Sequence, residues 1–377
     1  MSPIYLDYNA SALVRPEVRA VMAEALADNG NPSAVHAAGR RARGRVETAR
    51  AQIAELVGVR PEQLVFGSGG SEANAQAIAS AVAAGCERVI VSATEHPCVA
   101  LNAAAHGLPV ETIPVDGTGL IDLQWLAEAL KRPGRAMVAV HHANNETGVI
   151  QPIAEVARLT REAGGWTHVD AVQSLGKIPV DLDALGADTL TLSAHKLGGP
   201  QGVGAIVARI GTPMMRTLHG AGQERGLRAG TENVPGIAGF GAAAEAAGRE
   251  LAHAAAHAAW RDAAQARVKA AGAAVAGEGR ERLPNTLFLA VPDWPSPLQL
   301  IALDLQGIMI SAGSACSSGK QKPSAALMAM GREDLGGGGA RVSGGWGTTE
   351  SDWIHFAEAW TSAYEARKAR SAAPEYA

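Results

Sequence analysis

Short apolar runs alternate with alanine-rich, helix-forming stretches over the first two-thirds of the chain. The runs are rich in Val, Ile and Leu, and each leads into polar residues; they cover residues 63–66, 88–92, 136–140, 166–170, 189–193 and 202–207. Strands that alternate with helices form crossover units, so this pattern predicts a mostly parallel sheet. In open sheets of this kind, ligands bind beyond the carboxyl ends of the strands.

The pattern changes in the last third of the chain. Residues 239–277 are mostly Ala with scattered charged residues, which predicts one or two long helices that connect two domains. Short mixed segments follow at 286–290, 299–305 and 308–310, and they indicate a smaller α/β domain. We expect a large domain at residues 14–250 and a small domain made of residues 1–13 and 251–377.

Composition narrows the class of protein. The 377 residues are 47% hydrophobic and 19% charged, as in an ordinary globular enzyme, and this length suits two domains. A net charge of −4 gives no reason to expect nucleic acid or an anionic membrane as a partner. We see no signal peptide and no membrane-spanning run. With only 3 cysteines, a disulfide framework is not expected, and the prediction is a reducing, cytoplasmic location.

Candidate chemistry gathers where the predicted strands end. Lys196 follows one strand, Asp170 ends another, and Ser193 and His195 flank the lysine. A lysine at a crowded strand end is partly desolvated, which favours the free amine, although a solvated loop lysine is the default reading of any single Lys. A lysine that forms an imine and a carboxylate that keeps a pyridine nitrogen protonated are what pyridoxal 5'-phosphate (PLP) requires. Ser193 and His195 offer donors for its phosphate.

A glycine turn supplies a second candidate phosphate contact. Gly70 and Ser71 lie between a predicted strand and the start of a predicted helix. Backbone N–H groups at a helix N-terminus bind phosphate, and Ser71 can cap the helix and donate as well. The loop matches neither the Walker pattern nor the full dinucleotide fingerprint, so it carries little weight alone.

Three further residues each have a purely structural and a functional interpretation. His96 is either a capping or core histidine, or a proton shuttle on the cofactor ring. Asn145 is either a turn residue or a substrate contact. Arg341 is either a surface arginine or the bidentate partner of a substrate carboxylate. Glycines at 336–339 and 344–345 flank Arg341 and are expected to loosen the backbone there.

The three cysteines differ in their surroundings. Cys86 and Cys98 lie within ordered, apolar stretches and are expected to be inert. Cys316 lies among Gly, Ser and Ala, a composition typical of a mobile loop, and Lys320 and Lys322 follow it. The two lysines favour the thiolate, so Cys316 is the candidate nucleophile.

Taken together, these segments resemble the PLP-dependent cysteine desulfurases of the nitrogen-fixation and iron–sulfur-cluster type. The resemblance runs nearly end to end, and no single motif carries it. The matching segments are residues 5–10, 30–33, 94–96, 144–148, 168–174, 193–196, 223–231, 314–318 and 341–343. It implies the aspartate-aminotransferase-like fold of the class V branch, an α/β fold with a mixed sheet in a large domain and a smaller α/β domain that carries the cysteine loop.

The resemblance also implies roles for single positions. Lys196 would be the Schiff-base lysine and Cys316 the residue that takes sulfur from L-cysteine as a persulfide, leaving L-alanine. The other implied roles are cofactor contacts for Gly70, Ser71, His96, Asp170, Gln173, Ser193 and His195, a contact of Thr231 with the phosphate of the neighbouring subunit in a homodimer, and substrate-carboxylate contacts for Asn145 and Arg341. A sulfur-acceptor protein is the implied partner, for iron–sulfur clusters, thio-cofactors or tRNA thiolation, and no metal site is expected.

Two other functions fit the same residues. One is a different PLP enzyme of this fold, such as an aminotransferase or a selenocysteine or kynurenine lyase, because a fold hosts many reactions. The other is a catalytically idle paralogue that relays sulfur, against which the intact set of Lys196, Asp170, His96 and Cys316 argues. The sequence does not identify the sulfur acceptor.

Overall fold

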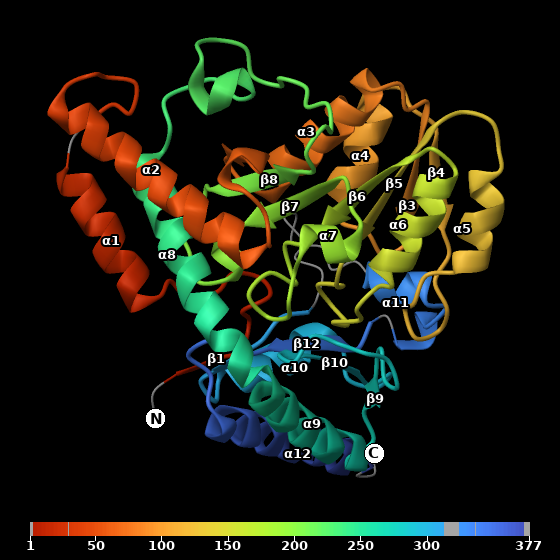
Figure 1. Ribbon diagram of the computed structural model, residues 1–377. Coiled ribbons are helices and arrows are strands. Elements are labelled where there is room, and N and C mark those ends of the chain that lie inside the picture. The colour runs from red at the N-terminus through yellow and green to blue at the C-terminus, as the bar shows by residue number, and fades with distance from the viewer. Residues whose placement is uncertain (1–2, 29, 313–323, 336, 373–377) are drawn as a thin grey trace.

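A seven-stranded sheet forms the centre of the molecule in the computed structural model (Figure 1), which describes residues 3–28, 30–312, 324–335 and 337–372. Its strand order is β2-β8-β7-β6-β5-β3-β4. The strands are β2 (Leu64–Gly67), β3 (Arg88–Ser92), β4 (Val110–Ile113), β5 (Ala136–His141), β6 (Trp166–Asp170), β7 (Thr189–Ser193) and β8 (Gly204–Ala208). Only β8 runs antiparallel to its neighbours, β2 and β7. The predicted mostly parallel α/β sheet is therefore confirmed.

The predicted strands agree closely with the observed ones. The runs at 88–92, 166–170 and 189–193 coincide with β3, β6 and β7, whose residues are buried throughout. Strands buried on both faces read as continuous apolar runs, which is why the sequence reveals them. The edge strand β4 was not predicted, because its four residues are half-buried or exposed except for Ile113.

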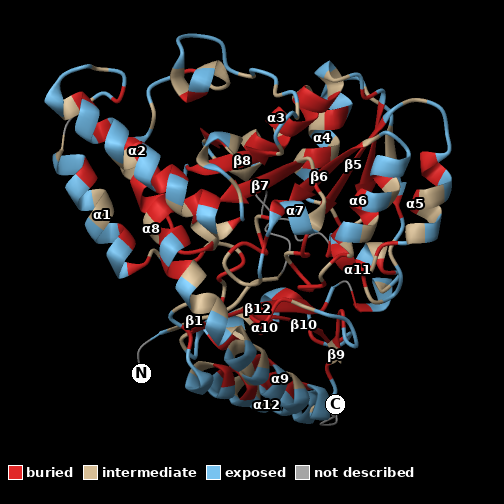
Figure 2. Ribbon diagram, in the orientation of Figure 1, coloured by how far each residue is buried: buried red, intermediate tan, exposed pale blue. Residues whose placement is uncertain are grey.

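Helices cover both faces of this sheet (Figures 1 and 2). Alternate residues of β5 illustrate the division, since Met137 and Ala139 join the core under α3 and α4, whereas Val138 and Val140 join the core on the opposite face. The helices of this part are α1 (Pro16–Ala27), α2 (Ala37–Leu56), α3 (Gly70–Ala83), α4 (Pro97–Ala105), α5 (Leu123–Leu130), α6 (Ile153–Glu162), α7 (Leu182–Leu185) and α8 (Val234–Glu250).

The alanine-rich stretch forms two helices, α8 and α9 (Ala254–Ala270), joined by a short 3₁₀ turn at Leu251–His253. We expected a connector, but α8 is part of the core and packs against α1 and α2. Gly241 makes this approach possible, because a Cβ atom there would lie only 2.5 Å from the Cα atom of Ala49. Small residues thus serve close helix packing here.

A second layer lies below the large sheet in Figure 1 and has its own core. Its three-stranded sheet has the order β12-β10-β9 and is antiparallel, and its core includes the buried side chains of Trp353, Phe356 and Trp360. Its elements are β9 (Ala274–Val275), β10 (Thr286–Ala290), α10 (Ser296–Asp304), β11 (Ile308–Met309), α11 (Ala325–Ala329), β12 (Gly339–Ser343) and α12 (Glu350–Ala372). The N-terminal strand β1 (Ile4–Tyr5) pairs with β11, and the domain boundaries stay a prediction.

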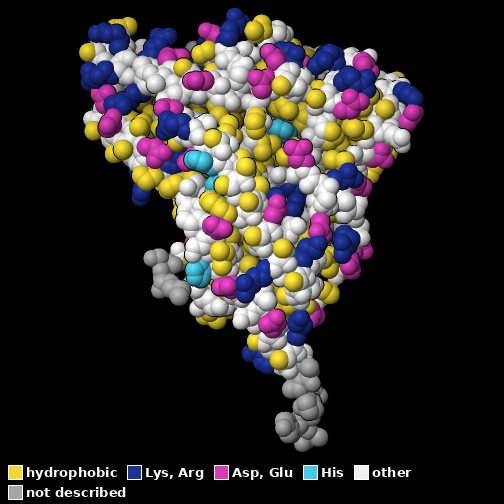
Figure 3. All heavy atoms as spheres, turned by 60° about the horizontal axis from the view of Figure 1, so that its bottom comes forward, with side chains coloured by type: hydrophobic (Ala, Val, Ile, Leu, Met, Phe, Trp, Pro, Cys, Tyr) yellow, Lys and Arg dark blue, Asp and Glu magenta, His cyan; other side chains and the backbone are white. Residues whose placement is uncertain are grey.

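The surface carries charges of both signs. Figure 3 shows Lys and Arg side chains interspersed with Asp and Glu over the face that it presents. Within the described part of the chain, no helix is long and apolar enough to cross a membrane.

Candidate active site

A cavity of about 490 Å³ lies beyond the carboxyl ends of β5, β6 and β7. Segments from both layers line it, because Arg341 of β12 faces the same space as the strand ends. The predicted site residues that line it are Gly70, Ser71, His96, Asn145, Asp170, Gln173, Ser193, His195, Lys196 and Arg341. The structure therefore brings these residues together, as expected for strand ends that meet at one sheet edge.

Lys196 ends a 3₁₀ turn directly after β7. Its Nζ atom donates hydrogen bonds to the backbone oxygens of Asn9, at 2.6 Å, and Ala10, at 2.8 Å. The pKa of the Lys196 ammonium is lowered to about 8, mainly by desolvation and also by the charge of Arg341, while Asp7 and Asp170 oppose the shift. Roughly a tenth of this lysine is therefore free amine at pH 7, far more than for an ordinary lysine, and the free amine is the form that a nucleophile or base requires.

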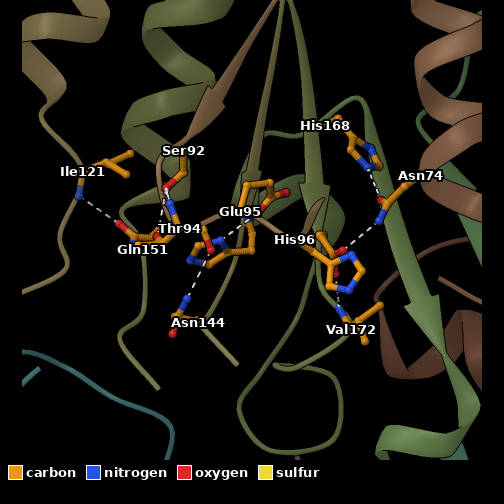
Figure 4. Close-up of polar contacts among 12 residues, drawn as sticks. Asn74, Ser92, Thr94, Glu95, His96, Ile121, Asn144, Gln151, His168 and Val172 are labelled. Carbon is orange, nitrogen blue, oxygen red and sulfur yellow. Dashed lines mark hydrogen bonds and ion pairs between the residues drawn. The ribbon is translucent and has the colours of Figure 1, made fainter. Parts of the chain in front are cut away.

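Asp170 is buried at the end of β6, and its carboxylate is fixed by two donors. Its Oδ2 atom accepts from Asn74 Nδ2 at 2.8 Å, and its Oδ1 atom accepts from the backbone N–H of Val172 at 3.0 Å (Figure 4). Asn74 is oriented in turn by His168, whose Nε2 lies 2.8 Å from Asn74 Oδ1. Burial lowers the pKa of His168 to about 4, so this ring is a neutral hydrogen-bonding group.

The start of α3 forms a compact turn under the cavity. Glu72 accepts from the backbone N–H of Ser68 at 2.7 Å and contacts Arg228 at 3.0 Å, which fixes the loop before the helix. A Cβ atom on Gly70 would lie 3.0 Å from Val172 Cγ2, so a larger residue would narrow the cavity. Backbone N–H groups, the Ser71 hydroxyl and the nearby Ser193 hydroxyl make this end suited to an anion.

His195 lies beside the same end of the cavity. Its Nδ1 atom lies 3.3 Å from the Ser11 hydroxyl. Burial lowers the pKa of His195 to about 4, and the charges of Lys196 and Lys177 add to the effect. The ring is therefore a neutral hydrogen-bonding group.

Arg341 is held more firmly than its glycine-rich surroundings led us to expect, and that expectation was wrong. The residue is central in β12, is 3% exposed, and pairs with Asp7 Oδ1 at 2.7 Å and with the backbone oxygen of Asn145 at 3.2 Å. The neighbouring glycines pack closely, since a Cβ atom on Gly339 would lie 2.6 Å from the ring of Phe288. They permit tight packing instead of loosening the strand.

Of the remaining predicted residues, one lies away from the cavity and the other is outside the described part of the chain. Thr231 is exposed and lines a separate hollow with Ser68, Arg228 and Asn233. Cys316 lies outside the described residues, within the segment 313–323.

Sequence reasoning missed a group of polar residues behind the cavity. Asn9 is 1% exposed, and its backbone oxygen accepts from both Lys196 and Gln173. Lys177 Nζ donates to Asn9 Oδ1 and to Gln173 Oε1, both at 2.8 Å, so it fixes the orientation of the Gln173 amide. The only available signal was that Lys177 follows Gln173 by four residues, which does not indicate a buried amine.

A second missed feature is a buried acid–histidine pair at the cavity wall. Glu95 Oε2 accepts from the backbone N–H of His141 at 3.1 Å and lies 2.7 Å from its Nδ1. Burial raises the pKa of Glu95, although the bonds to His141 oppose this. Adjacent titratable residues at strand ends, 94–96 and 141–142, were the available sign of this pair.

The family model of class V aminotransferases matches residues 4–353. A cysteine desulfurase of Cereibacter sphaeroides is 40% identical over 346 residues, which cover 88% of this chain and 87% of the relative. The chain belongs to the cysteine desulfurases of the class V aminotransferase family. The cysteine desulfurase IscS of Dictyoglomus turgidum is 38% identical to this enzyme over 362 residues, covering 93% and 91% of the two chains.

Solved structures agree with this membership. A NifS-like protein from Rickettsia africae superposes on this cysteine desulfurase with a TM-score of 0.88 at 32% identity, covering 96% of this chain and 99% of the other. SspA, solved in complex with cysteine, gives a TM-score of 0.77 at 31% identity, with 90% and 98% covered. The family resemblance seen in the sequence is therefore confirmed, as are the fold and the cysteine desulfurase activity that it implies for this chain.

Proposed function

We propose that this desulfurase holds PLP on Lys196, converts L-cysteine to L-alanine, and takes up the sulfur on Cys316 as a persulfide. The observation that carries the proposal is the pairing, in one cavity, of a lysine whose pKa is lowered to about 8 with a fixed, buried carboxylate. The relative solved with cysteine supports the choice of substrate.

The residues around the cavity fit PLP. The anion-binding end at Gly70, Ser71, Ser193 and His195 suits its phosphate, and Lys196 suits its aldehyde. Asp170 would hold the pyridine nitrogen, Gln173 the ring hydroxyl, and His96 would lie on the ring. Bound PLP would supply an electron sink for the carbon next to the substrate amine.

Different residues of the chain would carry out substrate binding, proton transfer and sulfur transfer. Arg341 and Asn145 would bind the substrate carboxylate, and the Lys196 amine would take the α-proton. The thiolate of Cys316 would attack the substrate sulfur, so that a sulfur–sulfur bond forms as the carbon–sulfur bond breaks. The electron pair stays with the substrate carbon, which is then protonated to give alanine.

The proposal extends to the assembly and its surroundings. We infer a homodimer in which exposed Thr231 reaches the phosphate site of the neighbouring subunit, and a sulfur-acceptor protein that discharges Cys316. We also infer a reducing, cytoplasmic location, because Cys86 and Cys98 are free thiols and a persulfide carrier must be regenerated as a thiol.

Product analysis tests this function. Purified full-length protein supplied with PLP, L-cysteine and a thiol reductant is expected to release alanine and sulfide in equal amounts. Boiled protein and a reaction without protein are the controls for non-enzymatic release by free PLP. A yellow, PLP-loaded protein that converts L-cysteine to 3-mercaptopyruvate, the keto acid that keeps the thiol, and releases neither sulfide nor alanine would indicate an aminotransferase and would contradict the proposal.

The lowered pKa of Lys196 predicts how cofactor uptake depends on pH. The amine must lose its proton to react, so the rate of PLP capture should rise roughly tenfold per pH unit below about 8 and level off above it. Absorbance changes during reconstitution measure this rate, and the reaction of PLP with Nα-acetyl-lysine corrects for titration of PLP itself. A rate that keeps rising to the ordinary lysine pKa of about 10.4 would contradict the prediction.

A further inference from the structure

His96 has two neighbours that fix its imidazole. It is the N-cap of α4, where its Nδ1 atom accepts from the backbone N–H of Cys98 at 3.3 Å. The Cys98 Sγ atom lies 2.9 Å from the same Nδ1. One ring nitrogen is therefore turned toward α4, while the ring itself lines the active-site cavity.

These contacts select one tautomer of the neutral ring. A backbone N–H can only donate, so Nδ1 must be an acceptor and the ring proton must be on Nε2. The thiol of Cys98 is then the second donor to Nδ1, because two acceptors cannot bond to each other. Desolvation raises the pKa of Cys98 to about 11, so the thiol keeps the proton that it donates.

The hydrogen bonds of Asn74, which contacts both Cys98 and Asp170, determine the direction of the Cys98 S–H bond. Asn74 Nδ2 donates to Cys98 Sγ at 3.3 Å and to Asp170 Oδ2 at 2.8 Å. The Asp170 carboxylate accepts only, so the Asn74 amide must present its nitrogen, and His168 bonds the opposite oxygen (Figure 4). Cys98 Sγ therefore accepts a hydrogen bond from Asn74 and directs its own S–H toward Nδ1 of His96.

We infer that Cys98 is a positioning residue that keeps the proton of the neutral His96 ring on Nε2, so that His96 presents a hydrogen-bond donor, and not a basic nitrogen, to the cavity. Its basic nitrogen is engaged by two donors on α4, and Nε2–H is left for the cavity. The role of His96 in catalysis rests on the proposed function, whereas the tautomer is a property of the protein alone.

The same contacts argue against a competing role for Cys98. A thiol in the active-site cavity invites the interpretation that it is a second sulfur acceptor. Only the thiolate is a good nucleophile, and a pKa of about 11 leaves almost none of it at neutral pH. Its contacts with Asn74 and His96 indicate that it positions the His96 ring instead.

Nitrogen NMR of histidine tests the inference directly. Full-length protein labelled with ¹⁵N-histidine is measured in alkaline buffer, before and after PLP loading, and the His96 signals are assigned with His96→Gln. The wild-type spectrum is expected to show protonated Nε2 and unprotonated Nδ1. Cys98→Ala should lower the ratio of the Nε2-protonated to the Nδ1-protonated tautomer about fivefold, which corresponds to the loss of one neutral hydrogen bond.

Two further variants make the outcome decisive. Cys98→Ser keeps a donor at this position and should retain the wild-type tautomer, and Cys86→Ala removes a buried thiol that lies before the start of β3 and should change nothing. A wild-type ring protonated on Nδ1, a Cys98→Ala spectrum equal to the wild type, or a Cys98→Ser spectrum equal to that of Cys98→Ala would each overturn the inference. The spectra of the protein without PLP decide this even if the protein proves not to desulfurate cysteine.

Discussion

Lys196→Ala is expected to lower the rate of alanine formation from L-cysteine by at least about 10³-fold, since loss of a positioned general base alone costs about 10²–10⁴-fold. The variant also loses the amine that would attach the cofactor. Borohydride reduction of the PLP-loaded wild type, followed by peptide mass mapping, should place the added mass on the peptide that contains Lys196. The variant should bind PLP only reversibly.

A second lysine near Lys196 could also react with PLP, so the mass mapping tests the choice between the two. Lys177 Nζ shares the Asn9 side of the site with Lys196, and desolvation lowers its pKa well below the ordinary value, so it is the other lysine that could compete for PLP. It does not line the active-site cavity, whereas Lys196 does, and its hydrogen bonds direct its amine to Asn9 and Gln173. The prediction fails if reduction marks the Lys177 peptide. Lys131→Ala, which removes an exposed lysine at the C-terminal end of α5, is the matched control and should leave the rate unchanged.

The large sheet was predictable because its strands carry their own signal. Buried parallel strands such as β6 and β7 are continuous apolar runs, so residues 166–170 and 189–193 were found at their observed bounds. Topology then places the strand ends at one edge, which is why Asp170 and Lys196 could be expected in one cavity. The edge strand β4 lacks that signal, because only one of its four residues is buried.

The network behind the cavity could not be predicted in the same way. Asn9 bonds to residues that are distant in sequence, including Asn145, Thr286 and Ser343, and each pair depends on the packing of the two layers. Neither periodicity nor a local motif encodes such contacts. Cys98 shows the same limit, since its apolar sequence neighbours predicted an inert residue, whereas its thiol contacts both Asn74 and His96.

Cys316→Ser is expected to lower both alanine and sulfide release on the order of 10³-fold, because the loss of a catalytic nucleophile removes the step itself. The described residues on either side of segment 313–323, which contains Cys316, contact the active site. Ser311 pairs through its backbone with Arg341, and Ser324 bonds to Glu146, which lines the cavity. The described residues that flank the segment are therefore held at the active site.

Substrate binding separates this loss from a failure to assemble. Cys316→Ser should still load PLP and change its absorbance when L-cysteine is added, because Lys196, Asp170 and Arg341 are intact. Cys86→Ser is the matched control, since Cys86 is buried before the start of β3, away from the strand ends that line the cavity, and should retain full turnover. Undiminished sulfide release by Cys316→Ser would mean that another group accepts the sulfur. Cys98 would then be the thiol to test, and its raised pKa is the reason that we expect the outcome to be loss.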